Sequence, residues 1–273
     1  MATFKFNHKT VFYQCDGNKD DAALLILNGI MMSTKSWDAF VPSFTKNYYL
    51  IRVDLLDQGQ TDKMTKEYTQ ALQVDLIKAL LSELKLDQVH LMGISYGGSV
   101  ALQFASRYPA KVNKLLLFNA VAKTSPWLKA IGDGWNEVAK SRNGLAYYHI
   151  AIPFIYSPGF YTKNVQWMED RKALLVPLFS DASFLDAMIR LTKSAETHDV
   201  VDDLKHITMP TMVVASEHDY LTPVFEQEFL VSKLKNGQLI TFNDCGHASM
   251  YEKPELFIAT ICGFLEDQET VKI

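Results

Sequence analysis

The chain has 273 residues, of which 48% are hydrophobic and 21% are charged. This length and composition predict one large globular domain, or a domain with an insertion, and exclude a chain that is disordered throughout. The 27 basic residues are outnumbered by 31 acidic ones and are scattered along the chain, so the net charge of −4 argues against nucleic acid as a partner.

The apolar runs of the sequence are too short to cross a membrane. The longest, at 22–27 and 145–156, fall short of the roughly 20 residues that a membrane-spanning helix needs. Residues 1–10 alternate polar and apolar side chains, whereas a signal peptide has a basic stretch and a small-residue cleavage site. We therefore expect a cytoplasmic protein. Three cysteines, Cys15, Cys245 and Cys262, form no CxxC pair and indicate neither a disulfide framework nor a zinc site.

Short apolar runs alternate with amphipathic segments along the chain. The runs predict strands buried on both faces of a parallel sheet, at 22–28, 49–54, 89–94, 114–119, 211–216 and 238–242. The segments between them predict helices at 36–44, 68–84, 96–108, 223–234 and 254–265. An antiparallel hairpin of 3–8 with 10–15 is expected at the edge of the sheet. The predicted fold class is α/β, with an eight-stranded, mainly parallel sheet and helices on both faces.

One interval, 121–203, interrupts this alternation, because its helical patterns are broken by prolines and glycines and no strand is indicated. It predicts a helical cap inserted after the sixth strand, which leaves 1–120 and 204–273 as the core. Within it, 147–167 holds seven aromatic residues. We expect these rings to attach the cap to the core, to line a ligand pocket, or both. A membrane-docking face is the third interpretation, disfavoured because the run lacks a basic polar face.

The strand at 89–94 leads directly into Gly-Ile-Ser-Tyr-Gly at 93–97 and then into a helix, which is the setting of a nucleophile elbow. Gly93 and Gly97 would let the strand and the helix approach closely, with Ser95 in a strained backbone conformation at the carboxyl edge of the sheet. The N-terminus of the following helix would favour negative charge there. Ser95 is therefore the candidate nucleophile.

A serine nucleophile needs a base and a carboxylate that orients the base. His247 follows the last predicted strand and is the candidate base. Asp219 lies in the loop after the strand at 211–216 and is the preferred acid, with Glu217 and Asp244 as competitors. Asn119, at the end of the neighbouring strand, offers no rival carboxylate. Structural or surface roles are expected for five other histidines, namely His8, His90, His149, His198 and His206.

Two backbone N–H groups are candidates for an oxyanion hole, which must face the charge that develops on a tetrahedral intermediate. One belongs to Tyr96, directly after the nucleophile. The other belongs to Ile30, in the turn that ends the first buried strand, where Gly29 would let the backbone come close. Cys245, two residues before the candidate base, is expected to be an inert buried thiol, with a redox-sensitive thiol as the alternative.

With these residues assembled, the chain resembles the α/β-hydrolase superfamily over essentially its whole length, and the order Ser95, Asp219, His247 is the order of that family. Members usually carry His-Gly at the oxyanion turn, where this chain has Asn-Gly at 28–29. They also carry Asp-x-Arg-Gly-His-Gly-x-Ser after the next strand, where residues 54–61 lack the Arg and the His. Both departures resemble the branch that contains 3-hydroxyacyl transferases of bacterial lipid synthesis and unassigned hydrolases.

The predicted function is that of a serine esterase or lactonase that acts on small to medium acyl substrates through an acyl-enzyme on Ser95. One alternative is an acyltransferase that passes a 3-hydroxyacyl group to an alcohol or thiol. The alternative from another class is a ligand-binding protein without turnover. A metal enzyme is disfavoured, because the His-Asp pairs at 198–199 and 218–219 lack a third ligand set. We expect a small-molecule ester or acyl substrate, no cofactor and no metal; the acyl chain length and oligomeric state stay open.

Overall fold

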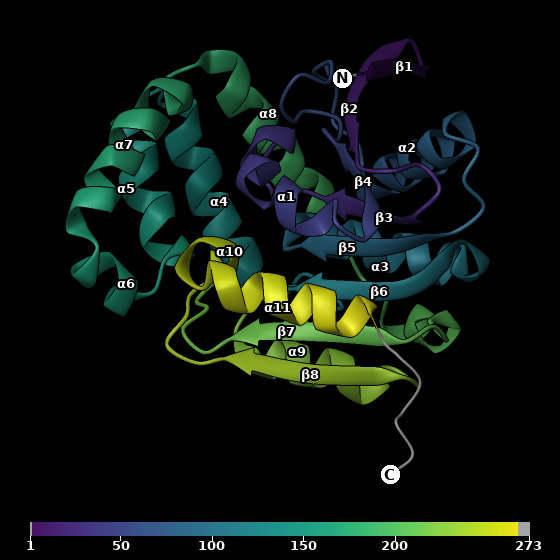
Figure 1. Ribbon diagram of the computed structural model, residues 1–273. Helices are drawn as coiled ribbons and strands as arrows, with labels where there is room; N and C mark the ends of the chain where they lie inside the picture. Colours follow the sequence, from purple (N-terminus) through teal and green to yellow (C-terminus); the bar gives the residue numbers. More distant parts are fainter. Residues whose placement is uncertain (1, 267–273) are drawn as a thin grey trace.

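One mixed sheet forms the centre of the molecule, which the computed structural model describes for residues 2–266. Its eight strands follow the order β1-β2-β4-β3-β5-β6-β7-β8 (Figure 1). They are β1 Ala2–Phe6, β2 Lys9–Asp16, β3 Ala22–Leu27, β4 Tyr48–Val53, β5 Val89–Ile94, β6 Val112–Phe118, β7 Thr211–Ser216 and β8 Gly237–Phe242. Strand β2 is antiparallel to β1 and β4, and the other neighbours are parallel. The predicted α/β class and eight-stranded sheet are confirmed.

Burial along the strands follows their position in the sheet. All six residues of β4 and of β7 are buried, as are five of the six in β3, because helices cover both faces of the central strands. The prediction that 238–242 is buried on both faces is wrong, since Phe242 alone is buried in β8. Strand β8 ends the sheet, so the helices that flank the central strands cover it only in part.

Helices lie on both sides of the sheet (Figure 1). The 3-10 helix η1 Thr34–Phe40, α1 Val41–Phe44 and α11 Pro254–Leu265 share one apolar core with the strands, whereas α2 Gln70–Glu83, α3 Tyr96–Arg107 and α9 Val224–Lys233 contribute to the other. The short elements η2 Pro109–Lys111 and α10 Ser249–Glu252 complete this part of the chain. The single helix predicted at 36–44 is thus two elements, because Pro42 lacks an N–H group and fits the first turn of a new helix.

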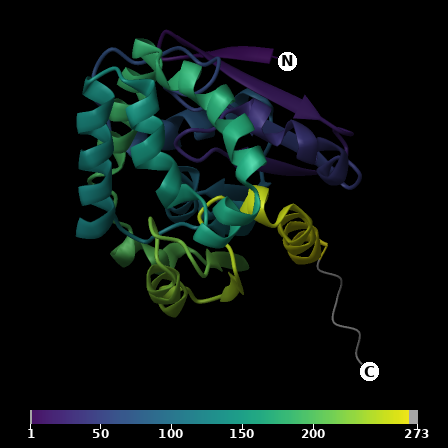
Figure 2. The same ribbon diagram turned by 90° about the vertical axis from the view of Figure 1, so that its left-hand side faces the viewer.

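The segment between β6 and β7 is helical. It contains α4 Pro126–Lys140, α5 Gly144–Ile155, α6 Pro158–Lys163, α7 Val165–Phe179, α8 Ala182–Ala195 and the 3-10 helix η3 Val201–His206. Ser125, Asn143, Ser157 and Asp181 accept N–H groups with their side chains at the starts of α4, α5, α6 and α8, which explains where these helices begin. Helices α4–α8 stand together beside the sheet, as Figure 2 shows from that side.

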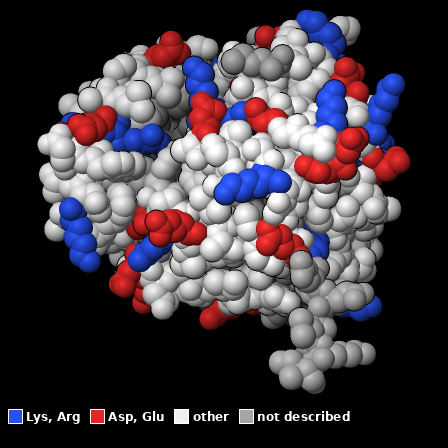
Figure 3. All heavy atoms as spheres, viewed as in Figure 1, with Lys and Arg blue, Asp and Glu red and all other residues white. Residues whose placement is uncertain are grey.

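A β-bridge between Lys123 and Asp199 brings the two ends of the helical segment together. The division into a core of 1–120 and 204–273 and a cap of 121–203 stays a prediction. In the described part of the chain, no helix is long and apolar enough to cross a membrane. Basic and acidic side chains are interspersed on the face shown in Figure 3.

Candidate active site

The turn between β5 and α3 places Ser95 in a backbone conformation that few residues adopt. Its φ of 51° and ψ of −115° lie outside the regions favoured by residues with a side chain. Gly93 and Gly97 make this turn possible. A Cβ atom on Gly93 would lie 2.7 Å from Gly98 Cα, and one on Gly97 would lie 2.6 Å from Asn28 O. The turn therefore holds Ser95 at the carboxyl end of β5 and at the start of α3.

Asp219 and His247 form a buried pair. His247 Nδ1 lies 2.7 Å from Asp219 Oδ2, and both side chains are almost fully buried. Because a carboxylate oxygen only accepts hydrogen bonds, Nδ1 carries the proton, and Nε2 of the neutral ring is an acceptor. Asp219 also accepts the N–H groups of Leu221 and Thr222 at 2.8 and 2.9 Å, and the Thr222 hydroxyl at 2.7 Å. These bonds fix the carboxylate against the imidazole ring.

Asn119, directly after β6, is a residue of this site whose role the sequence did not reveal. Its amide Nδ2 donates to Asp219 Oδ2 at 2.7 Å and to Ser216 Oγ at 2.9 Å. Its backbone φ of 51° is left-handed, which asparagine tolerates better than most residues. A polar residue at the carboxyl end of a strand next to β7 was the available signal. Asn119 thus orients the acid without being an acid itself.

The two competing acids, Glu217 and Asp244, interact with other groups. Glu217 Oε2 accepts the N–H of Asp244 at 2.8 Å, and Asp244 Oδ1 lies 4.0 Å from His218 Nε2. Ligand atoms of Glu217, His218 and Asp244 lie within 4.8 Å of one another, so these residues could in principle share a cation. Both carboxylates are exposed. This cluster is separate from the Asp219–His247 pair.

Ser95 and His247 line one cavity of about 180 Å³ whose lining is mostly apolar. The helical segment contributes Ile131, Trp135, Ile152, Tyr156, Leu175 and Phe179 to it. Tyr147 and Tyr148, from the aromatic-rich run, are instead fully buried. Both contact other residues of the segment, Phe179 and Met168. Trp167 joins the segment to the core, since its ring centroid lies 6.2 Å from that of Tyr251, and Tyr156 borders the cavity.

The turn after β3 brings Ile30 to the cavity, and two side-chain amides hold this turn. Asn28 Oδ1 accepts the indole N–H of Trp37 at 2.7 Å. Gln58 Nε2 donates to Gly29 O at 2.9 Å, and Asn28 Nδ2 donates to Gln58 Oε1 at 3.2 Å. Gln58 stands where the resembling family carries histidine. The departures from the family pattern at 28 and 58 thus form one hydrogen-bonded unit.

The side chain of Tyr96 connects the turn after β5 to the helical segment. Its hydroxyl lies 2.8 Å from Ser194 Oγ on α8 and 3.5 Å from Gln73 Nε2 on α2. Burial raises the pKa of Tyr96 to about 12, so the phenol is protonated at neutral pH. Tyr96 also lines the cavity beside Ser95. The residue that carries the second candidate oxyanion donor is therefore held by two helices in addition to its own.

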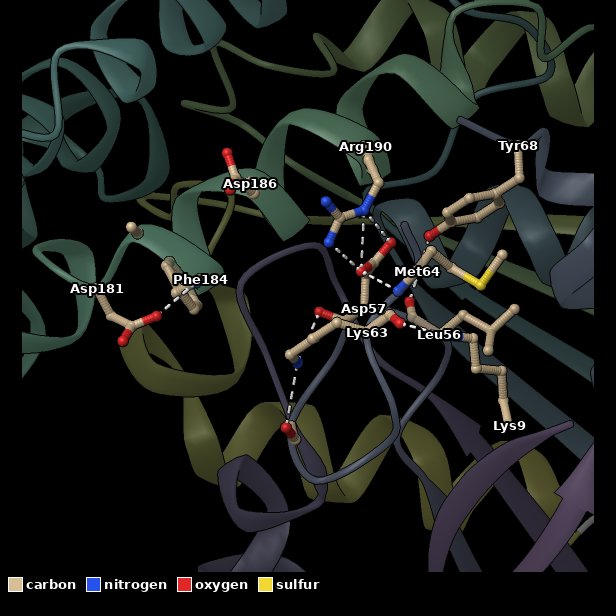
Figure 4. A network of polar contacts seen from close by, with 12 residues as sticks. Lys9, Leu56, Asp57, Lys63, Met64, Tyr68, Asp181, Phe184, Asp186 and Arg190 are labelled. Carbon is tan, nitrogen blue, oxygen red and sulfur yellow. Dashed lines mark hydrogen bonds and ion pairs between the residues drawn. The ribbon is translucent and has the colours of Figure 1, made fainter. Parts of the chain in front are cut away.

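A buried ion pair joins α8 to the loop after β4 (Figure 4). Arg190 Nη2 lies 2.6 Å from Asp57 Oδ1, and Arg190 Nε lies 3.0 Å from Asp57 Oδ2. Asp57 is 1% exposed and accepts the Met64 N–H at 3.0 Å. Lys63 Nζ donates to the Asp57 carbonyl at 3.1 Å. Because a bidentate pair constrains orientation as well as distance, it fixes α8 against the loop.

His198 and Cys245 were expected to be a structural histidine and an inert buried thiol, and their surroundings agree with this. His198 Nε2 lies 2.9 Å from Val121 O, and its Nδ1 lies 3.0 Å from Gln103 Nε2. Both ring nitrogens therefore have protein partners. Cys245 is fully buried, and burial raises the pKa of its thiol to about 12. It stays protonated, which agrees with an inert thiol.

Comparisons with known proteins agree with this architecture. A family model described as the alpha/beta hydrolase fold matches residues 22–254. A crystal structure of MGS-M2, an alpha/beta hydrolase enzyme from a Medee basin deep-sea metagenome library, is 56% identical, with a TM-score of 0.97 and 100% coverage of both chains. The 3-oxoadipate enol-lactonase 1 of Acinetobacter baylyi is 26% identical over 94% of each chain. An esterase from Thermogutta terrifontis shares the fold, with 21% identity, a TM-score of 0.83 and coverage of 97% of this chain and 96% of that one. The chain therefore belongs to the alpha/beta-hydrolase family.

Proposed function

We propose that the chain is a serine-dependent hydrolase that cleaves carboxylic esters or lactones of small to medium acyl substrates. One observation carries the proposal: a mostly apolar cavity is bordered both by Ser95, on a strained strand-to-helix turn, and by His247, whose ring is hydrogen-bonded to Asp219. The relative named 3-oxoadipate enol-lactonase supports an ester or lactone as the bond that is cleaved.

In the proposed mechanism, Ser95 Oγ attacks the carbonyl carbon while His247 Nε2 accepts its proton. The backbone N–H groups of Ile30 and Tyr96 stabilise the oxyanion of the tetrahedral intermediate. His247 then donates the proton to the leaving alcohol. Asp219 holds the ring in the Nδ1-protonated tautomer and stabilises its positive charge. Water, activated by the same imidazole, releases the acid from Ser95.

The helical segment has the role of a cap in this proposal. Its side chains supply much of the apolar lining of the cavity that Ser95 and His247 border, so the acyl group would be recognised by packing against residues of 121–203. Hydrophobic selection of this kind distinguishes neighbouring chain lengths by only about 1–3 kcal/mol per methylene. We therefore expect a preferred acyl length with gradual decline on either side.

Hydrolysis of p-nitrophenyl esters with acyl chains of two to twelve carbons tests the proposal. Ser95→Ala should lower kcat by about 10⁶ and Asp219→Asn by about 10⁴. Ser106→Ala, on the same helix as the nucleophile turn, is the matched control and should behave as wild type. Near-normal turnover by Ser95→Ala would refute the nucleophile assignment. If the wild type hydrolyses no ester, the esterase proposal is refuted, and an acyltransferase or a ligand-binding protein remains. An assay for acyl transfer to a 3-hydroxy acid acceptor would distinguish these two.

A further inference from the structure

One cationic side chain borders the candidate active-site cavity without a carboxylate partner. Arg171 lies on α7 and lines the same cavity as Ser95 and His247. The residue is partly buried, and its Nε atom is buried without a hydrogen-bond partner. A buried donor without an acceptor is unfavourable and uncommon in folded proteins, so it calls for a group that is supplied from outside the chain.

The other charged groups of the cavity pair with each other. Lys129 Nζ lies 3.5 Å from Glu196 Oε2, and both residues line the cavity. Within residues 2–266, Arg171 makes no ion pair. Its guanidinium carbon lies 4.7 Å from the ring centroid of Tyr251 and 5.8 Å from that of Trp167. The hydroxyl oxygens of Tyr156 and Tyr251 are hydrogen-bond partners of the guanidinium, so Nε is the donor that remains without a partner.

The surroundings keep Arg171 charged. Burial disfavours the charged guanidinium, but the phenol groups of Tyr156 and Tyr251 outweigh burial and raise the pKa of Arg171. Both tyrosines also line the cavity. A fixed positive charge beside a mostly apolar lining attracts an anion more strongly than the same charge would in water.

We infer that Arg171 forms a carboxylate subsite, and that the substrate is an ester or lactone that carries a second, free carboxylate group. A carboxylate fits because its two oxygens can accept two parallel N–H bonds from one guanidinium. The apolar lining would receive the hydrocarbon part that joins the two carbonyl carbons. The inference rests on the proposed function, since it requires the scissile carbonyl at Ser95, and it narrows the substrate class to half-esters of dicarboxylic acids and lactones with a carboxylate substituent.

Paired substrates separate charge recognition from packing. Monoethyl esters of linear dicarboxylic acids are compared, at each chain length, with neutral ethyl esters in which an isopropyl group replaces the free carboxylate, and acid release is followed in a pH-stat. At the best length, Arg171→Met should lower kcat/KM for the half-ester about 100-fold, which corresponds to the loss of hydrogen bonds to a charged group. The neutral ester should change less than about threefold, because methionine keeps an unbranched side chain at this position and removes only the charged group.

Two further variants control for charge and for position. Arg171→Lys keeps the positive charge but loses the bidentate geometry, so it should recover only part of the half-ester activity. Lys172→Met removes the neighbouring charge on α7, which is paired with Glu169, and should leave both substrates unaffected. Equal losses for charged and neutral esters in Arg171→Met would reveal a packing role and overturn the inference while the hydrolase proposal stands.

A binding measurement tests the carboxylate subsite without requiring the protein to hydrolyse a substrate. Linear dicarboxylates of each chain length in the ester series are titrated by calorimetry into Ser95→Ala protein and into the Ser95→Ala/Arg171→Met double variant. We expect at least tenfold weaker binding to the double variant. Equal binding, or no binding to either protein, would overturn the carboxylate subsite. If no ester is hydrolysed by the wild type but dicarboxylate binding depends on Arg171, the hydrolase proposal fails and the subsite stands.

Discussion

The Arg190–Asp57 pair allows a quantitative prediction of how firmly α8 is attached to the rest of the protein. Arg190→Met keeps most of the aliphatic stem but leaves the Asp57 carboxylate, which is 1% exposed, without its cationic partner. Removing one member of a buried ion pair typically destabilises a protein by about 3–5 kcal/mol, because the remaining charge stays desolvated. Arg190 is itself 15% exposed, so water reaches the site in part. We therefore expect a loss of about 3 kcal/mol in the free energy of unfolding.

Thermal and urea denaturation, followed by circular dichroism, measure this loss. At about 2–4 °C per kcal/mol for a chain of this size, Tm should fall by about 6–12 °C. Asp186→Ala, also on α8, is the matched control. It breaks a pair with Arg142 in which both side chains are more than 40% exposed, and such pairs contribute at most about 1 kcal/mol.

The double variant Asp57→Asn/Arg190→Met tests the physical reason for the loss. It removes both charges of the pair, and asparagine tolerates the left-handed φ of 69° at this position. It should therefore recover a large part of the stability that Arg190→Met loses. The reasoning is refuted if Arg190→Met destabilises no more than Asp186→Ala does, or if the double variant is less stable than Arg190→Met.

Three further predictions concern Asn119, His198 and Cys245. Asn119→Ala removes a donor to the Asp219 carboxylate and should lower kcat about 10- to 100-fold with little change in KM; an unchanged kcat for the preferred ester would contradict this role. Burial lowers the pKa of His198 below 6.5, so the unfolded chain takes up this proton more readily than the folded protein. The stability associated with neutral His198 is complete above about pH 6.5 and declines as the pH falls below it, by up to about 1.4 kcal/mol per pH unit. Urea denaturation between pH 7 and 5 should therefore show a shallower decline for His198→Gln than for wild type, and equal slopes would be inconsistent with the assignment. With a pKa of about 12, Cys245 should be roughly 10⁻⁴ thiolate at pH 8 and resist iodoacetamide in the native protein while reacting in urea; rapid native labelling, located by mass spectrometry, would disprove its inertness.

Local patterns were sufficient to predict the strands and most helices outside 121–203. The apolar runs at 89–94 and 211–216 coincide with β5 and β7, because a strand covered by helices on both faces has no polar face to interrupt the run. The motif at 93–97 predicted the strand-to-helix turn, since its glycines and the strained serine are neighbours in sequence. The exposure of β8 was not predictable from the run at 238–242, because the place of a strand in the sheet depends on all the other strands.

The candidate site was also predictable from the sequence only in part. Ser95, Asp219 and His247 could be proposed because each follows a predicted strand, and the carboxyl ends of parallel strands share one edge of the sheet. Their catalytic roles stay predictions.

Tertiary structure alone decided which polar and charged side chains meet. Arg190 and Asp57 are 133 residues apart in the chain, and Asn119 and Asp219 are 100 apart. The position of Arg171 at the cavity likewise depends on how α7 packs against α5, α6 and α8. Such contacts carry no sequence period, because a hydrogen bond or an ion pair depends on the distance between two side chains after packing, and that distance is set by every element between them.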